Sequence, residues 1–321
     1  MKAFLSIVLL SFAWQAFAQD YIGAKGPMFE SKKYDFPMET GLIVPPPSDR
    51  KDEAVLDMGR LYAGALPAKF SWKDEGKTTP IRNQGSCGSC WAFSMSATMA
   101  DVLEIFGDVI DADLSEQYLV SCQTEYYGCR GGWMEFRMFL ENGNVWETDF
   151  PYKAKDLACP NNLSYHHKIK NWGYVAGSSS IPDPELLKRA IYTFGPVSVA
   201  VAAVGDFMNY SSGIYNGSAS GGLNHAVNLV GWDDTASVPH WIMRNSWGSN
   251  WGENGWMKIA YGSRKIGYAA TFIDYKGEIG PDPTPDPTPD PPCGNDMPWY
   301  FIILPILAVL GIVGIVKLRK S

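Results

Sequence analysis

This chain of 321 residues has only four histidines and no excess of positive charge. Its 27 lysines and arginines stand against 34 aspartates and glutamates, so the net charge is -7. A chain without a basic surface is a poor nucleic-acid binder, and we expect no nucleic-acid partner. The scarcity of histidine also leaves few candidates for a catalytic base.

The two ends of the chain carry targeting signals. Residues 1–18 combine a lysine, an apolar run and an Ala-Phe-Ala site, which predicts a cleaved secretory signal peptide. Residues 280–298 repeat Pro-Asp-Pro-Thr and predict an extended stalk. Residues 299–316 are uncharged and apolar, with Trp299 and Tyr300 at their start and a basic ending after them. This pattern predicts a transmembrane helix and a cytoplasmic tail at residues 317–321.

The predicted topology puts the folded body outside the cell or in the lumen of a lysosome-like or vacuole-like compartment. A glycolipid-anchor signal, or removal of the tail by a sorting enzyme, is the alternative to a retained membrane helix. Secretion also places the six cysteines in an oxidising compartment, where pairing is the default.

Between these ends the composition and hydrophobic pattern of the sequence change twice. Residues 19–65 carry three consecutive prolines, mixed charge and little periodicity, and indicate a removable or weakly ordered segment. Residues 66–279 form the predicted body, with helical patterns first and strand patterns after about Asn171. We predict an α+β fold in which a helical lobe packs on a mostly antiparallel β lobe, with a cleft between them. The predicted helices are 90–106, 114–120 with Asp113 as N-cap, 132–140 and 186–192, and the predicted strands are 197–204, 226–232, 241–245, 255–260 and 269–273.

The most informative stretch reads Gln84-Gly-Ser-Cys87-Gly-Ser-Cys90-Trp-Ala-Phe93. A glycine and serine loop leads into a helix, so Cys90 lies in the first turn. Unpaired N–H groups and the helix dipole there favour a thiolate, which predicts a lowered pKa and a reactive sulfur. A redox pair or half of a zinc site is the alternative, but Cys122 and Cys129 do not supply the spacing of a second zinc pair. We expect neither a metal nor an organic cofactor.

This stretch resembles the nucleophile segment of the papain-like, cathepsin-like cysteine proteases. Two further segments carry the same resemblance: Leu-Asn224-His225-Ala-Val and Asn245-Ser-Trp247-Gly. The resemblance implies that His225 accepts the thiol proton of Cys90 and that Asn245 orients its imidazole. It also implies oxyanion donors at the Cys90 backbone N–H and the Gln84 side-chain amide.

Substrate-binding residues follow from the same resemblance. Gly-Cys129-Arg-Gly131-Gly132 is similar to a family segment whose exposed backbone lines one wall of the cleft. The specificity pocket implied by the resemblance is small or apolar and contains no acid. We therefore expect preference for a bulky apolar side chain two residues before the cut. The residues expected to contact substrate are Gly131, Gly132, Ala200, Leu223, Asn224, Trp247 and Ala270.

The number of cysteines alone does not determine how the disulfides are paired. With Cys90 as nucleophile and Cys293 in the stalk, the remaining four cysteines allow three pairings. The resemblance implies one of them, Cys87–Cys129 with Cys122–Cys159.

The sequence thus predicts a monomeric cysteine endopeptidase that cleaves peptides and proteins through an acyl-enzyme. Residues 19–65 would be its inhibitory propeptide, and the absence of an extra cysteine-bounded loop favours endopeptidase over exopeptidase activity. A catalytically silent surface binding protein on the same scaffold is the main alternative. Acyl transfer to an amine rather than to water is another, because it shares the acyl-enzyme.

Overall fold

The computed structural model describes residues 28–46, 56, 58–126 and 128–276. The predicted signal peptide, stalk, membrane helix and cytoplasmic tail (residues 1–18, 280–298, 299–316 and 317–321) lie outside these ranges. Among the described residues, no helix combines the length and apolar character needed to cross a membrane.

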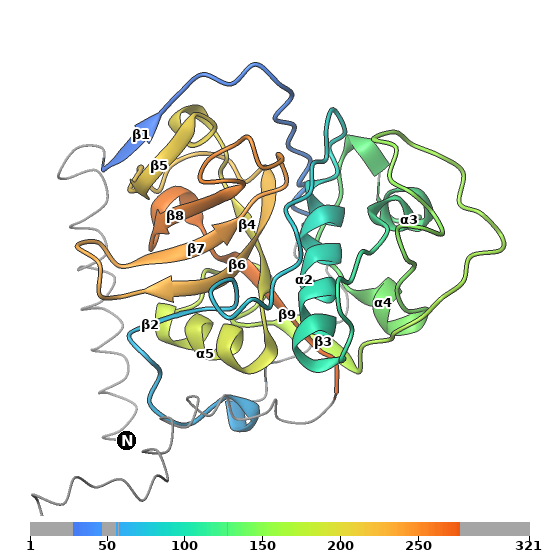
Figure 1. Cartoon of the computed structure of the whole chain (residues 1–321), viewed down its shortest axis with the longest axis horizontal. Coiled ribbons are helices and arrows are strands. Elements are labelled where there is room, and N and C mark those ends of the chain that lie inside the picture. Colours follow the sequence, from blue (N-terminus) through green and yellow to red (C-terminus); the bar gives the residue numbers. More distant parts are fainter. Residues whose placement is uncertain (1–27, 47–55, 57, 127, 277–321) are drawn as a thin grey trace, which may run out of the picture. The chain divides into compact units, whose positions relative to one another are not determined.

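The central helix of the fold is α2, Cys90–Phe106, with the bounds that the sequence predicts. Fourteen of its 17 residues are buried, so α2 is enclosed on nearly every side rather than packed along one face. It contacts helix α3 (Glu116–Cys122) on one side and strand β6 (His225–Asp233) on the other (Figure 1). The helix that carries Cys90 therefore lies where the two halves of the body meet.

Two predicted helices have other bounds in the structure: α3 is shifted by two residues, and α4 is shorter. Helix α3 begins after Ser115, whose side chain accepts a hydrogen bond from the Tyr118 N–H, so Ser115 and not Asp113 is the N-cap. Leu114, predicted to be helical, instead forms a β-bridge with Trp146. Helix α4 covers only Arg137–Glu141, because the backbone of Gly132 pairs with Leu42 and leaves the helical geometry.

Within the described part of the chain, nine strands form the second half of the fold. They follow the order β1-β5-β8-β7-β6-β4-β9-β3, with β2 paired to β6, and all pairs except β5–β8 are antiparallel. Helix α5 (Pro184–Phe194) begins at the N-cap Asp183 and packs on β6 and β9. The strands are β1 Phe29–Ser31, β2 Lys69–Ser71, β3 Asn171–Tyr174, β4 Val197–Val201, β5 Tyr210–Tyr215, β6 His225–Asp233, β7 His240–Arg244, β8 Trp256–Ala260 and β9 Tyr268–Asp274.

The α+β prediction is therefore confirmed. Two hydrophobic clusters form the core of this fold. One cluster surrounds α2, α3 and Trp133, and the other lies between the sheet and α5. A buried ion pair, Asp101–Arg244 at 2.6 Å, joins α2 to the end of β7 across the seam. Removing one partner of such a pair would leave a buried charge uncompensated, so the pair fixes how α2 sits against the sheet.

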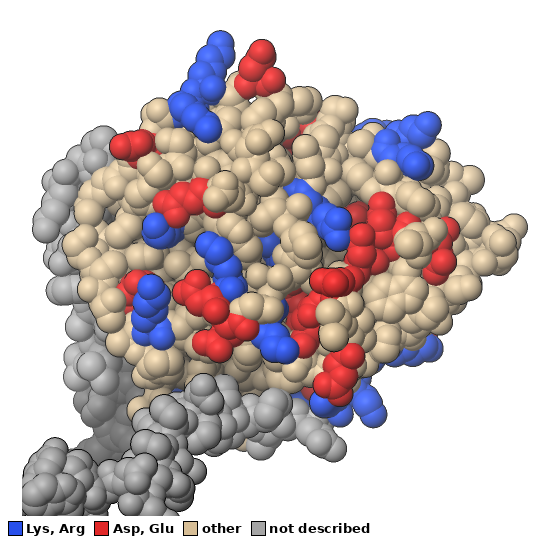
Figure 2. All heavy atoms as spheres, in the orientation of Figure 1, with Lys and Arg blue, Asp and Glu red and all other residues tan. Residues whose placement is uncertain are grey.

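Two disulfides reinforce the helical half. Cys87 is bonded to Cys129 and Cys122 to Cys159, which is the pairing that the resemblance implies. Cys90 is the free cysteine of the described residues. Acidic and basic side chains are interspersed on the face shown in Figure 2, in keeping with the absence of a basic surface expected from the composition.

Candidate active site

Cys90 occupies the first position of α2 and is fully buried. The loop before it is held on both sides: the Cys87–Cys129 disulfide fixes one end, and the Tyr152 hydroxyl bonds both Ser89 Oγ (2.6 Å) and the Gln84 carbonyl (2.8 Å). The thiol has hydrogen bonds with the backbone of Ala226 and of Gly41. Because Ala226 directly follows His225, the thiol lies beside the start of β6.

His225 and Asn245 come together as predicted from the sequence. His225 Nε2 lies 2.8 Å from Asn245 Oδ1, and the same oxygen accepts the Ser246 N–H at 2.8 Å. Because an amide oxygen can only accept, Nε2 carries the proton, and the neutral imidazole has its lone pair on Nδ1. Nδ1 is buried and has no hydrogen-bond partner among the described residues. It is therefore the ring atom available to exchange a proton with Cys90.

Trp247 covers this histidine–asparagine pair. Its ring stacks on the His225 imidazole with a centroid distance of 4.6 Å and an interplanar angle of 24°. Trp247 is itself buried and packs edge-on against Trp251, with the ring centroids 5.3 Å apart. A hydrogen bond kept away from water in this way is electrostatically stronger than an exposed one, so the indole stabilises the tautomer set by Asn245.

The expected low pKa of Cys90 is wrong for this state of the chain. Burial raises the pKa of the Cys90 thiol to about 11, although hydrogen bonds from neighbouring backbone groups act in the opposite direction. Burial likewise lowers the pKa of His225 to about 4, despite its bond to Asn245. The desolvation of both groups outweighs the helix dipole, so the structure holds a neutral thiol beside a neutral imidazole.

Gln84 is also placed beside Cys90. Its side-chain nitrogen donates to the Cys87 carbonyl at 2.9 Å, and its side-chain oxygen accepts the Ser246 hydroxyl at 2.6 Å. Because the Cys87 carbonyl can only accept, the amide atom bonded to it is the nitrogen, and the Ser246 hydroxyl is then the donor to the amide oxygen. Ser246 and Tyr152 are not predicted from the sequence: Ser246 directly follows Asn245, whereas Tyr152 stands in none of the motifs.

A stretch of the predicted propeptide lies across this site. Residues 39–44, the cleft segment, pair by backbone with the groups expected to hold substrate. The Gly132 N–H donates to Gly41 O at 2.9 Å, and Gly132 O accepts the Ile43 N–H at 2.9 Å. The Leu42 N–H donates to Asn224 O at 3.0 Å. The Trp247 indole N–H donates to Glu39 O at 2.8 Å. These bonds explain the complete burial of Cys90 and His225.

Leu42 is the buried side chain of the cleft segment, with 6% of its surface exposed. It belongs to the hydrophobic cluster that includes Ala200, Ala226 and Ala269, and Leu223 packs against the same cluster. Ala270, expected in the specificity pocket, instead belongs to the cluster between the sheet and α5. Its neighbour Ala269 is the residue of the two that belongs to the cluster with Leu42, at a point where the pairing of β9 with β4 shifts register.

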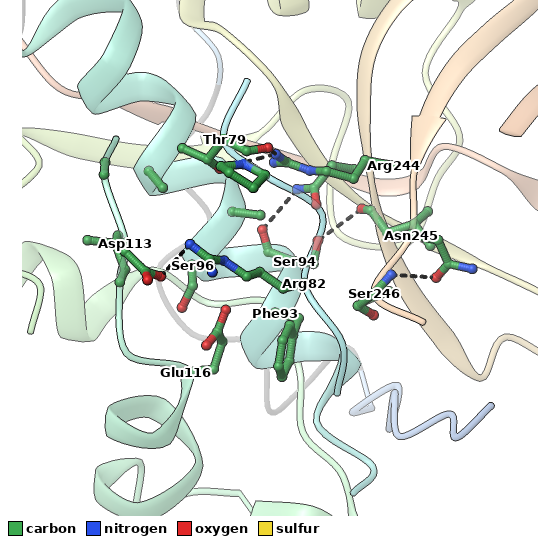
Figure 3. Close-up of a pocket in the computed structure, with 18 residues that line it drawn as sticks. Thr79, Arg82, Phe93, Ser94, Ser96, Asp113, Glu116, Arg244, Asn245 and Ser246 are labelled. Carbon is green, nitrogen blue, oxygen red and sulfur yellow. Dashed lines mark hydrogen bonds and ion pairs between the residues drawn. The ribbon is translucent and has the colours of Figure 1, made fainter. Parts of the chain in front are cut away.

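A pocket of about 440 Å³ lies behind the site, between α2 and the end of β7 (Figure 3). Asn245 and Ser246 line one side, while Arg82 forms an ion pair with Asp113 at 2.8 Å on the other. Burial, with a contribution from Glu147, raises the pKa of Glu116 in this pocket to about 8 and keeps it protonated at neutral pH. Cys90 and Gly132 do not line the pocket, so it is separate from the cleft that the propeptide fills.

A cysteine, a histidine with a fixed tautomer and an asparagine, held between a helical and a β lobe, define a papain-like fold and site. Residues 66–274 match the model of the papain family cysteine proteases, and the chain belongs to this family. Zingipain-2 from Zingiber officinale is 39% identical over 200 residues, which cover 60% of this chain and 87% of zingipain-2.

Two further comparisons agree with the family. A viral cathepsin from Heliothis zea nuclear polyhedrosis virus is 39% identical over 208 residues, covering 62% of this chain but only 55% of the viral protein. The chain thus matches little more than half the length of that relative. The structure of digestive procathepsin L2 proteinase from Tenebrio molitor larval midgut is 32% identical, with a TM-score of 0.67 over 74% of this chain and 78% of that one.

Proposed function

We propose that the chain is a cysteine endopeptidase that uses Cys90 as nucleophile and His225 as general base and acid. The observation that carries this proposal is the bond from His225 Nε2 to Asn245 Oδ1, which leaves Nδ1 as the buried ring nitrogen without a hydrogen-bond partner among the described residues. Nothing in this arrangement calls for a metal ion, and the family match is to proteases.

In the proposed reaction His225 Nδ1 takes the thiol proton and the Cys90 thiolate attacks the carbonyl carbon of the scissile bond. The carbonyl oxygen becomes an oxyanion that accepts hydrogen bonds from the Cys90 N–H and the Gln84 amide. Nδ1–H then protonates the leaving amine, and the C–N bond breaks to give a thioester on Cys90. A water, deprotonated by His225, hydrolyses the thioester and restores the thiol.

A thiol-directed epoxide tests the nucleophile. The chain, freed of its propeptide and treated with the reagent, should carry one adduct, on the peptide that contains Cys90, and should stop cleaving a fluorogenic peptide. A catalytically silent binding protein would show neither cleavage nor an adduct that tracks lost activity. Added amine nucleophiles would form amide products if acyl transfer were the true reaction.

We also propose that residues 19–65 are an inhibitory propeptide whose cleft segment blocks the catalytic residues. Gly41 is the point of closest approach, because a Cβ at this position would clash with the Gly88 carbonyl. In the variant Gly41→Val the cleft segment should therefore bind less tightly against Gly88. A synthetic propeptide with this change should inhibit the activated enzyme at least about tenfold more weakly, which is about 1.4 kcal/mol of binding free energy.

The matched control is Lys33→Ala, which lies in the same propeptide at an exposed position. Its inhibition constant should equal that of the unchanged peptide. Equal inhibition by the Gly41→Val peptide would show that the cleft segment does not sit against Gly88 when it inhibits.

Specificity is proposed to favour a bulky apolar residue two positions before the cut. Leu42 supports this proposal, because its buried side chain lies with Ala200 and Ala269 and has Leu223 against the same cluster. Burial of a leucine side chain contributes about 1.5–3 kcal/mol, whereas an arginine there would meet no acid. We expect kcat/KM for a peptide with Leu at that position to exceed the value for Arg at least about tenfold. Comparable values would contradict the proposal.

Membrane attachment through residues 299–316 is proposed on the sequence pattern alone, with the protease body outside the cell or in a lumen. The full chain should sediment with membranes after an alkaline wash, because an apolar helix of about 18 residues is held by the hydrocarbon core. A chain ending at residue 298 should stay in the supernatant. If both forms behave alike, the anchor is absent or is removed.

A further inference from the structure

A second part of the proposed propeptide, which follows the cleft segment after residues 45–55, is docked on the body. It comprises Leu56 and residues 58–65, here called the outer segment. It runs beside α5 and the end of β9 (Figure 1). Its contacts with α5 and β9 involve none of the residues Cys90, His225, Asn245 and Gln84, so we assign it a role other than blocking the catalytic residues.

An arginine ties the outer segment to β9. Arg60 forms an ion pair with Asp274, whose side chain is only 4% exposed, and the Arg60 guanidinium carbon lies 5.6 Å from the centre of the Phe194 ring. A carboxylate buried to this degree depends on its partner. The arginine is therefore part of the surface that closes over Phe194 at the end of α5.

Apolar side chains add to this contact. Leu56 and Leu61 are 6% and 7% exposed and belong to the hydrophobic cluster between the sheet and α5. The Tyr62 ring lies 5.0 Å from that of Tyr192. Each buried leucine contributes about 1.5–3 kcal/mol, and the segment is already joined to the body at residue 66, so little chain entropy opposes its docking.

The backbone of the outer segment is held as well. The Tyr62 N–H donates to Thr193 Oγ1 at 2.9 Å, and Arg189 donates to the carbonyls of Tyr62 and Gly64 at 2.6 and 3.0 Å. A protease must bind several residues in extended form before it cuts. Backbone bonding and burial, rather than position in the sequence, decide which bonds are accessible.

We infer that the active enzyme keeps the outer segment as its N-terminal part, and that the activating cut falls on the N-terminal side of Leu56. This inference rests on the proposed function, since it concerns how that protease is activated. The cleft segment must leave before substrate can enter, whereas the outer segment can stay. Each cut is a simple hydrolysis of one amide bond, so no further reactant is needed.

The test uses the full chain with Cys90→Ala, which cannot process itself, and thermolysin as an unrelated protease. Digestion continues until residues 28–46 are lost, and the mass of the denatured product then gives its new N-terminus. We expect an N-terminus at or before Leu56 that persists over a further tenfold increase in thermolysin. A product that begins at residues 65–68 when the cleft segment is lost would overturn the inference.

A second comparison isolates docking as the cause. With Arg60→Ala and Leu61→Ala together, the product should shift to an N-terminus at residues 65–68 at least about ten times faster, whereas Lys33→Ala should change nothing. Persistence of the outer segment in the double variant would show that docking does not protect it, and would also overturn the inference. Because Cys90→Ala is inactive throughout, these outcomes do not depend on the chain being a protease, which the epoxide experiment tests separately.

Discussion

Replacing His225 with alanine should reduce kcat/KM for peptide hydrolysis at least about 10³-fold, the upper part of the range for loss of a general acid–base group. The thiol of Cys90 would keep its proton at neutral pH, and the leaving amine would have no proton donor. The measurement is a fluorogenic peptide assay on the activated enzyme, with active-site titration to correct for the amount of folded protein. Asn245→Ala should reduce kcat/KM by a smaller factor, because Asn245 acts only through the orientation of the imidazole.

The matched control is His166→Ala, since His166 is a partly exposed histidine whose ring is paired with Asp149 at 3.5 Å. Its activity should stay within about twofold of the unchanged enzyme. Near-normal hydrolysis by His225→Ala, with normal thermal stability, would remove His225 from the mechanism. A variant that lost activity only because it failed to fold would show a lowered Tm, which separates the two explanations.

The candidate catalytic residues could be located in the sequence because each stands in a local motif with its own geometry. Cys90 follows a glycine and serine loop and opens a helix, which by itself defines the turn. His225 opens β6, and Asn245 directly follows β7, the neighbouring antiparallel strand. The pairing of these two strands brings the two side chains together, and the resemblance of both motifs to the papain-like family, rather than the strand signals, was the reason to expect it.

The propeptide was harder to predict, because its order comes from contacts with distant residues. Gly41 and Leu42 have no motif of their own, and they become ordered only by bonding to Gly132 and Asn224. Strand β1 exists only because it pairs with β5, which the sequence analysis also missed. The wrong prediction for the pKa of Cys90 has the same origin. The helix dipole, a local feature, predicted a lowered pKa, but burial under a distant segment of the chain raises it.

The choice between Ala269 and Ala270 on β9 shows a further limit of prediction from sequence. The side chains of a strand alternate between faces, so an error of one residue moves the prediction to the opposite face of the sheet. Ala269 and Ala270 are chemically identical, and nothing in the sequence says which faces the cleft. Ala269 belongs to the hydrophobic cluster that contains Leu42, at a point where the pairing of β9 with β4 shifts register, and this shift has no signal in the sequence.

The reactivity of Cys90 should change by about four orders of magnitude when the propeptide is removed. In the covered state the thiol has a pKa of about 11, so only about one molecule in 10⁴ is a thiolate at pH 7. The neighbouring imidazole has its pKa lowered to about 4 and carries no charge that could stabilise a thiolate. Once uncovered, both groups regain water, and the helix N-terminus and an imidazolium favour the thiolate. Iodoacetamide labelling of the Cys90 peptide, followed by mass spectrometry, measures the ratio.

The raised pKa of the Cys90 thiol also predicts the direction in which labelling changes with pH. Below a raised pKa the thiolate fraction grows tenfold for each pH unit, so labelling of the intact chain should rise about a hundredfold between pH 7 and pH 9. The activated enzyme should show little change over that interval, because its thiolate is already formed. Gly41→Val in the intact chain should move its labelling toward the activated rate, since the cleft segment would no longer seal the thiol. If the intact and activated chains were labelled at the same rate, with the same pH profile, the cleft segment would not cover Cys90 in solution.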